Sequence, residues 1–128
     1  MIRKATRNDI PGILELVNAN LGTLLPRTKE DYEELIDTTY VYEKDNRIVG
    51  SCVLEIYSPK IAEIRSFVVH NDYRSQGVGK ALIGEAVTEA RERNIREIMV
   101  VTSAREYFEK HNFGACLNEK FALFWNGR

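Results

Sequence analysis

This 128-residue sequence has few of the residues that form disulfide frameworks, metal centres or membrane spans. Its two cysteines, Cys52 and Cys116, are far apart and lack the C-x-x-C spacing of zinc sites, so we expect reduced thiols in a cytoplasmic protein. Two histidines give little material for a metal centre, and we predict none. No apolar run approaches the roughly 20 residues that cross a bilayer, and the N-terminus has no signal-peptide core.

The sequence also lacks an excess of charge of either sign, because its 18 Lys and Arg residues nearly balance its 19 Asp and Glu residues. This balance argues against bulk electrostatic binding to nucleic acid or to anionic lipid. Hydrophobic residues make up 44% of the chain and charged residues 29%, which is typical of soluble globular proteins. We therefore expect one domain, residues 1–128, without linkers or repeats.

The most informative stretch, residues 61–93, has the pattern of a strand, a basic glycine loop and a helix. Residues 61–70 have the β-branched and aromatic content of a buried strand. Turn residues follow, then the loop, and then apolar residues that share one helical face, namely Leu82, Ile83, Ala86, Val87 and Ala90. The pattern predicts that a helix begins directly after the glycines.

The junction between this loop and its helix is suited to an anion. The first turn of a helix has backbone N–H groups without intrahelical partners, and the helix dipole is positive there. Gly77 and Gly79 let the backbone approach a ligand closely, and Arg74 and Lys80 add positive charge. A phosphate or pyrophosphate is the expected ligand.

Two common phosphate motifs do not fit the loop. The third glycine of the Rossmann pattern would fall on Leu82, and the Walker pattern fails because Ala81 follows Lys80. The loop instead fits the Arg/Gln-x-x-Gly-x-Gly/Ala signature, and residues 67–82 resemble the acetyl-CoA-binding core of the GNAT superfamily of acetyltransferases. The resemblance implies acetyl-CoA as co-substrate, with the loop amides on the pyrophosphate and the preceding strand beside the pantetheine arm. The cofactor-binding residues that it implies are Phe67, Val68, Val69, Arg74, Ser75, Gln76, Gly77, Val78, Gly79 and Lys80.

The rest of the chain predicts the element order β-α-α-β-β-β-α-β-α-β-β, which is also the order of the GNAT fold. A Thr28-x-x-Asp31 capping box begins the second helix, and residues 96–102 predict a buried strand. Residues 113–117 and 120–125 predict a closing pair of strands. The expected fold class is α/β (α+β): a mixed, mostly antiparallel sheet with a splayed parallel strand pair, flanked by helices.

Acetyl transfer to an amine needs an unprotonated amine, a polarised thioester carbonyl and a proton for the departing thiolate. Glu63 is the first candidate for the general base, because its Ala-Glu-Ile context resembles that of several GNAT members, including histone acetyltransferases. Glu55 is the second candidate, and a solvated strand carboxylate is the alternative for Glu63. The resemblance also implies that a backbone N–H near Val68 polarises the carbonyl.

The candidate general acid departs from the family pattern. Many GNAT proteins have Phe-Tyr-x-Lys-x-Gly-Phe after the second parallel strand, whereas this chain has the order Tyr107-Phe108. The family tyrosine position therefore falls on Phe108, which has no proton to donate. Tyr107, about 100° away around a helix, is the candidate acid. Core packing of Tyr107 and release of the thiolate to solvent are the alternatives.

The acceptor is suggested by a resemblance to the acetyltransferase domain of N-acetylglutamate synthase, which shares the Leu-Leu-Pro-Arg-Thr element at residues 24–28. It implies that Arg27, with Arg65 behind it, holds an acceptor carboxylate; ordinary surface arginines are the alternative. We therefore expect direct transfer to the amine of an amino acid such as glutamate. A polyamine or protein amine as acceptor, and a CoA-binding sensor with little turnover, remain open, as does the homodimer that many GNAT proteins form through C-terminal strands.

Overall fold

The computed structural model describes residues 1–22, 24–117, 120–121, 123, 125 and 127. It contains a five-stranded sheet in the order β1-β2-β3-β4-β5, antiparallel except for the parallel pair β4-β5. These strands are β1 (Ile2–Lys4), β2 (Thr39–Lys44), β3 (Arg47–Ile56), β4 (Ile61–Val69) and β5 (Glu97–Met99). The predicted fold class, a mixed and mostly antiparallel sheet, is confirmed.

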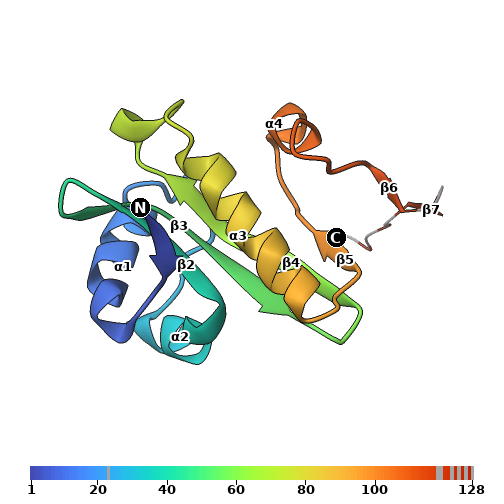
Figure 1. The fold of residues 1–128 in the computed structure, drawn as a ribbon, viewed down its shortest axis with the longest axis horizontal. Helices are drawn as coiled ribbons and strands as arrows, with labels where there is room; N and C mark the ends of the chain where they lie inside the picture. The colour runs from blue at the N-terminus through green and yellow to red at the C-terminus, as the bar shows by residue number, and fades with distance from the viewer. Residues whose placement is uncertain (23, 118–119, 122, 124, 126, 128) are drawn as a thin grey trace.

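Helices cover both faces of this sheet (Figure 1). The chain order is η1 (Arg7–Asp9) and α1 (Ile10–Asn18), α2 (Lys29–Glu34) and η2 (Ile36–Thr38), η3 (Asn71–Tyr73) and α3 (Val78–Glu92), and then α4 (Arg105–Glu109). Two short strands, β6 (Cys116–Leu117) and β7 (Lys120–Phe121), form a separate hairpin. The predicted order of elements is confirmed; of the predicted last strand, positions 122 and 124 lie outside the described residues.

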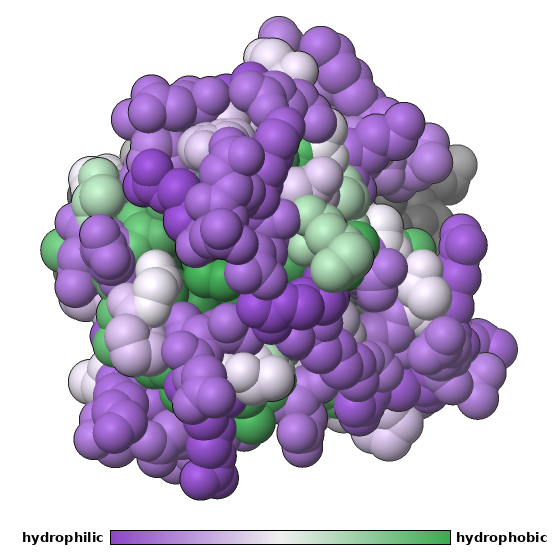
Figure 2. Space-filling view, turned by 60° about the vertical axis from the view of Figure 1, so that its left-hand side comes forward, coloured by the Kyte–Doolittle hydropathy of each residue, from purple (hydrophilic) through white to green (hydrophobic). Residues whose placement is uncertain are grey.

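The sheet has a hydrophobic core on each face. On one face α3 packs against the strands, through Val78, Leu82, Ala86 and Ala90. On the other face α1 and α2 contribute Ile10, Ile13, Leu16, Val17 and Tyr32. Figure 2 shows that the side bearing α1 and α2 is mostly hydrophilic on its outside. Among the described residues, no helix is both long and apolar enough to cross a membrane.

Close packing sets the position of the α3 N-terminus. A Cβ on Gly50 of β3 would lie 2.6 Å from Val78 Cγ1 and 3.1 Å from Leu82 Cδ1. Only a glycine lets the first turns of α3 approach the strand this closely. The glycine loop is thereby held against the middle of the sheet.

The strands β4 and β5 separate early. In the part of the chain that the structure describes, β5 pairs with β4 only at residues 61–63, so the predicted strand over residues 96–102 is shorter than expected. Within β4, Ser66 has φ of 51°, and Cys52 of β3 faces both Ser66 and Phe67 where the register shifts. This bulge bends β4 just beyond its last contact with β5. Among the described residues, those of β4 after Glu63 are not paired with β5, so this edge of β4 can contact other groups.

Glu89 of α3 connects the helix to the N-terminal strands. Its Oε1 accepts a hydrogen bond from the Tyr40 hydroxyl at 2.6 Å and lies 3.0 Å from Lys4 Nζ, while Arg93 Nε donates to Oε2 at 2.9 Å. The hydrogen bond from Tyr40, with smaller effects of Lys4 and Arg93, lowers the pKa of Glu89 to about 2. The carboxylate is therefore stabilised in the folded state.

We expect Glu89→Gln to lower the free energy of unfolding by about 1–3 kcal/mol at pH 7. Since the folded pKa lies below the ordinary value of 4.5, this contribution is complete above that pH and is lost as the pH falls towards about 2. Denaturant unfolding at pH 7 and at pH 3 measures it. The exposed Glu92 on the same helix, mutated to Gln, is the control, and equal losses in the two variants would contradict this role of Glu89.

Candidate active site

The N-terminus of α3 has no side-chain cap. Gly77, with φ of 82°, is the N-cap residue, and the first turn contains no acidic residue. By contrast, α2 begins with the predicted capping box, in which Thr28 Oγ1 accepts from the Asp31 N–H at 3.1 Å. The N–H groups at the start of α3 are thus left for a ligand, and the positive end of the helix dipole favours an anion.

A cavity of about 630 Å³ opens in front of this helix end, and we call it the glycine-loop cavity. From β4 and the loop it is lined by Phe67, Val68, Val69, Tyr73, Arg74, Ser75, Gly77, Val78, Gly79 and Lys80. From the α1–α2 connection and the α4 region it is lined by Asn20, Leu24, Ser103, Ala104, Tyr107, Phe108 and His111. The cavity combines a basic, uncapped helix end with an apolar wall, which suits a long ligand with a charged end.

Nine of the ten predicted cofactor residues line this cavity, and Gln76 is the exception. Its side chain accepts a hydrogen bond from Lys44 Nζ at 2.8 Å and donates to the Asp72 carbonyl at 3.4 Å. Gln76 therefore ties the loop to the β2–β3 hairpin. Its expected contact with the cofactor stays a prediction.

A second cavity, of about 540 Å³, lies along the other part of β4, and we call it the Glu63 cavity. Its lining comprises Leu24, Leu25, Glu63, Ile64, Arg65, Ser66, Phe67, Met99, Val100, Val101 and Phe108. Leu24, Phe67 and Phe108 line both cavities. Two ligands could therefore meet beside Phe67, next to the bulge of β4.

Glu63 is 9% exposed and belongs to a cluster of charges on β3 and β4. The Tyr57 hydroxyl donates to Glu63 Oε1 at 2.5 Å, and Arg65 Nε lies 4.0 Å from the same oxygen. Glu55 faces Glu63 directly across the strand pair, and Arg65 Nη1 binds Glu55 Oε2 at 3.0 Å. Arg65 of β4 thus bridges the two facing carboxylates, Glu55 of β3 and Glu63 of β4.

Arg27 lies behind this cluster. Its Nε donates to Ser66 Oγ at 2.6 Å, and its Nη2 lies 3.5 Å from Glu55 Oε2. The side chain is 11% exposed, and the buried Nη2 makes no hydrogen bond with any described residue. Of the two predicted carboxylate-binding arginines, Arg27 was the first candidate and Arg65 the second; Arg65 is the one that lines the Glu63 cavity, and the role of each stays a prediction.

The two neighbouring aromatic residues of α4 have different surroundings. Phe108 is 4% exposed and packs edge-on against Phe67 and Phe113. Tyr107 is 37% exposed, and its hydroxyl lies 2.1 Å from the place that a Cβ on Gly79 would take. Tyr107 thus reaches across to the first turn of α3, and partial burial raises the pKa of its hydroxyl. It lines the glycine-loop cavity and keeps its proton at neutral pH.

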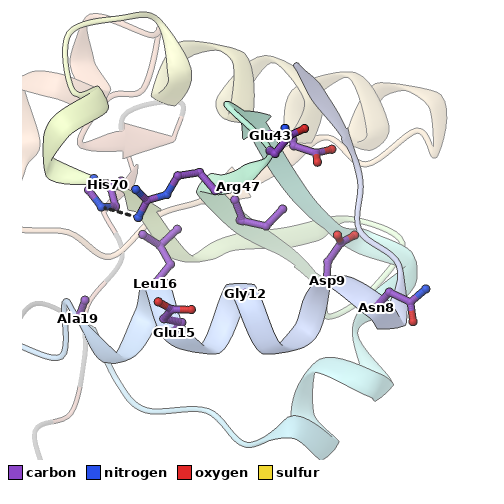
Figure 3. A pocket seen from close by; sticks show the side chains of 11 residues that line it. Asn8, Asp9, Gly12, Glu15, Leu16, Ala19, Glu43, Arg47 and His70 are labelled. Atoms are coloured by element: carbon purple, nitrogen blue, oxygen red, sulfur yellow. Dashed lines mark hydrogen bonds between the residues drawn. The ribbon is translucent and has the colours of Figure 1, made fainter.

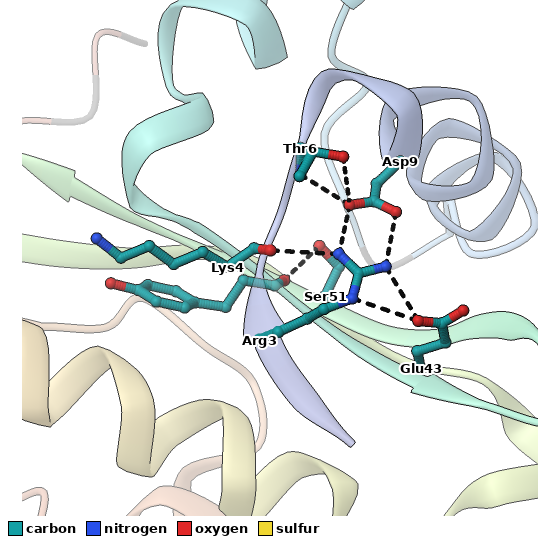
Figure 4. A network of polar contacts seen from close by, with 7 residues as sticks. Arg3, Lys4, Thr6, Asp9, Glu43 and Ser51 are labelled. Atoms are coloured by element: carbon teal, nitrogen blue, oxygen red, sulfur yellow. Dashed lines mark hydrogen bonds and ion pairs between the residues drawn. The ribbon is translucent and has the colours of Figure 1, made fainter.

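A third cavity, of about 510 Å³, lies between α1 and the β2–β3 hairpin (Figure 3). There, Arg47 Nη2 lies 3.2 Å from His70 Nε2. Two carboxylates of the lining, Asp9 and Glu43, are both held by Arg3, which binds Asp9 with two hydrogen bonds of 2.7 and 2.9 Å (Figure 4). These contacts join β1, η1 and β2, so Asp9 and Glu43 of this cavity have a structural role.

Residues 12–113 match the acetyltransferase (GNAT) family. The chain belongs to this family. GNAT acetyltransferases use acetyl-CoA as their co-substrate, and the glycine-loop cavity offers the uncapped helix end and the open β4 edge that such a molecule needs.

The curated relatives of this GNAT domain include the amino-acid acetyltransferases of Salmonella typhi and Yersinia pestis, which are 34% and 33% identical over 116 residues. The match covers 88% of this chain but only 26% of either relative. The chain thus spans about a quarter of the length of these relatives.

Solved structures agree with this assignment. A Mycobacterium tuberculosis protein crystallised in complex with CoA has a TM-score of 0.86 and 25% identity, over 91% of this chain and 73% of that one. N-acetylglutamate synthase from Neisseria gonorrhoeae, in complex with coenzyme A and N-acetyl-glutamate, has a TM-score of 0.81 and 26% identity, over 87% of this chain and 27% of that one.

Several residues of the GNAT site were missed by the sequence analysis. Tyr57, which contacts Glu63, lies outside the motif; Tyr73, which lines the glycine-loop cavity, lies within residues 67–82 but was not singled out. Leu24 lines both cavities, although only the neighbouring Arg27 was singled out. Tyr57 could have been suspected, because it follows Glu55 by two residues and so faces the same side of an extended chain.

Proposed function

We propose that this GNAT domain transfers the acetyl group of acetyl-CoA directly to the amine of an amino acid such as glutamate. One observation carries the proposal: the glycine-loop cavity and the Glu63 cavity share a wall at Phe67. The first is suited to the anionic co-substrate, and the second contains the carboxylate of Glu63, which lies on the same strand as Phe67. Amine and thioester can therefore approach each other there without a covalent enzyme intermediate.

The proposed chemistry assigns one task to each group. Glu63 removes a proton from the ammonium form of the acceptor, because an amine with pKa of about 9–10 is mostly charged at neutral pH. The nitrogen then bonds to the acetyl carbon and the carbon–sulfur bond breaks. The nitrogen releases its surplus proton to solvent as the amide forms, and the departing sulfur takes a proton. Tyr107 is the proposed donor of that proton. A backbone N–H near Val68, which lines the glycine-loop cavity, is the proposed group that polarises the carbonyl.

Two arginines, Arg65 and Arg27, are candidates to bind the carboxylate of the acceptor. Arg65 lines the Glu63 cavity with its side chain 33% exposed, and among the described residues only its Nη1 and Nε form ion pairs, with Glu55 and Glu63. Behind it, Arg27 Nη2 lacks a hydrogen bond within the described residues. We propose that Arg65 binds the acceptor carboxylate and that Arg27 supports it through Glu55 or binds it after a small shift.

The test is CoA release from acetyl-CoA in the presence of free amino acids, polyamines or short peptides. We expect clear preference for glutamate or aspartate. Arg65→Ala should then raise the KM for this acceptor about 10–100-fold, because a charged hydrogen bond to the acceptor is lost. The KM for acetyl-CoA should not change, since Arg65 lines the Glu63 cavity and not the glycine-loop cavity. The exposed Arg91 on α3, mutated to Ala, is the control for removing a positive charge.

Other outcomes would point elsewhere. A preference for polyamines or peptides would keep the acetyltransferase reaction and discard the carboxylate-binding role of Arg65 and Arg27. Tight CoA binding without turnover on any acceptor would favour a CoA-binding sensor. The apolar Phe108 at the usual tyrosine position supports this alternative.

A further inference from the structure

Tyr57, which follows the last residue of β3, is the one described residue that donates a hydrogen bond to the Glu63 carboxylate. Its hydroxyl lies 2.5 Å from Glu63 Oε1 and 3.3 Å from Glu55 Oε2. Tyr57 is 48% exposed, whereas Glu63 is 9% exposed. The tyrosine therefore covers a mostly buried carboxylate from the solvent side.

The contacts of Glu63 leave its two oxygens in different states. Both the hydroxyl of Tyr57 and Arg65 Nε approach Oε1. Within the described residues, Oε2 has neither a hydrogen bond nor an ion pair, and it is not fully buried. A hydrogen bond on one oxygen fixes the rotation of a carboxylate about its last bond. The direction of the other oxygen is then fixed as well.

We infer that Tyr57 is a positioning residue, which fixes the Glu63 carboxylate in the orientation in which it accepts a proton from the acceptor amine. This inference rests on the proposed function, in which Glu63 is the general base. It adds a residue outside the motif and assigns the two oxygens of Glu63 to different tasks: Oε1 to the tyrosine and Oε2 to the acceptor amine.

The charges around Glu63 show why a neutral donor matters. Glu55 of β3 faces Glu63, and its negative charge favours a protonated Glu63. Arg65 on β4 opposes this effect but is closer to Glu55, at 3.0 Å, than to Glu63, at 4.0 Å. Arg27 is likewise paired with Glu55, and β5 places the uncharged Met99 opposite Glu63. The hydroxyl of Tyr57 is thus the nearest group that favours the ionised base.

Tyr57 can keep this role over a wide pH range. Desolvation of its hydroxyl, together with the Glu63 carboxylate, raises the pKa of Tyr57 to about 12. The hydroxyl therefore stays protonated and can donate at every pH where the acceptor amine is assayed. Loss of the hydroxyl leaves the Glu63 carboxylate without its one hydrogen-bond donor among the described residues, while Glu55 remains opposite it.

The decisive experiment compares the pH dependence of kcat/KM for the wild type, Tyr57→Phe and Glu63→Gln, with the acceptor that the panel selects. We expect the acidic limb of the wild-type profile to move up by about 0.5–1 pH unit in Tyr57→Phe, with kcat about 3–30-fold lower at neutral pH. The KM for acetyl-CoA should not change. Tyr42→Phe, which removes a half-buried hydroxyl from β2, is the matched control and should keep the wild-type profile.

The outcomes separate the two ideas. An acidic limb that survives in Glu63→Gln would discard Glu63 as base, whatever Tyr57→Phe does. A limb that depends on Glu63 but stays in place in Tyr57→Phe would overturn the inference on Tyr57 alone. Carboxyl ¹³C NMR of Glu63 gives a reading that needs no turnover: its signal should move in Tyr57→Phe as the carboxylate loses its hydrogen bond, and an unchanged signal would also overturn the inference.

Discussion

Glu63→Gln is expected to lower kcat about 10²–10⁴-fold near neutral pH, the usual effect of losing a general base. The amide has nearly the shape of the carboxylate but accepts a proton poorly. The defect should shrink as the pH rises towards the pKa of the acceptor amine, because more of the amine is then already unprotonated. Cofactor affinity should stay intact, since Glu63 lines the second cavity and not the glycine-loop cavity. Steady-state rates between about pH 6 and pH 10 measure both effects.

Glu55→Gln is the matched variant, because it removes the same charge from the facing position on β3. Glu55 binds Arg65 and pairs with Arg27, so we expect this change to act through the arginines, on the KM for the acceptor. The acidic limb of the profile should remain. The opposite pattern, with the limb lost in Glu55→Gln and kept in Glu63→Gln, would assign the base to Glu55.

Gly77→Asp is expected to weaken CoA binding by about 50-fold or more. The substitution places a carboxylate at the uncapped N-terminus of α3, where an anionic ligand would otherwise meet the positive end of the dipole. A like charge at about 4–6 Å costs on the order of 2–4 kcal/mol near a protein surface. A Cβ on Gly77 meets no atom within 4 Å, so steric conflict does not explain such a loss. Calorimetric titration with CoA measures it.

Gly77→Asn separates charge from backbone strain. Asn and Asp have nearly the same shape, and both tolerate positive φ better than most residues, so both variants bear a similar cost at φ of 82°. We expect the Asn variant to bind CoA within a few-fold of the wild type. Equal losses in both variants would assign the effect to the backbone, and wild-type affinity in Gly77→Asp would refute the loop as the anion site.

The parts of the protein that local sequence controls were predicted well. The Thr28-x-x-Asp31 capping box forms as expected, because its two hydrogen bonds join residues three positions apart. The glycine loop directly precedes a helix, since Gly77 takes the left-handed conformation that other residues avoid. The element order followed from hydrophobic periodicity, which reflects one buried face of each helix or strand.

Contacts between distant segments were predicted less well. Arg27 and Ser66 are 39 positions apart, and their hydrogen bond depends on the bulge in β4. Gln76 belongs to the motif, yet it binds Lys44 of the neighbouring hairpin. The strand after α3 is shorter than its apolar run because it leaves β4 after Met99. Each of these features depends on register or strand separation, which local patterns do not fix.

By itself, the sequence determined the family, the glycine loop at the start of a helix and the strand before it, because these depend on residue types at short spacings. Only the tertiary structure decided which arginine lines the Glu63 cavity, which hydroxyl holds Glu63 and where the two cavities meet. The physical reason is that antiparallel pairing brings Glu55 opposite Glu63 and lets Tyr57 fold over them, while the bulge at Ser66 turns β4 towards Arg27.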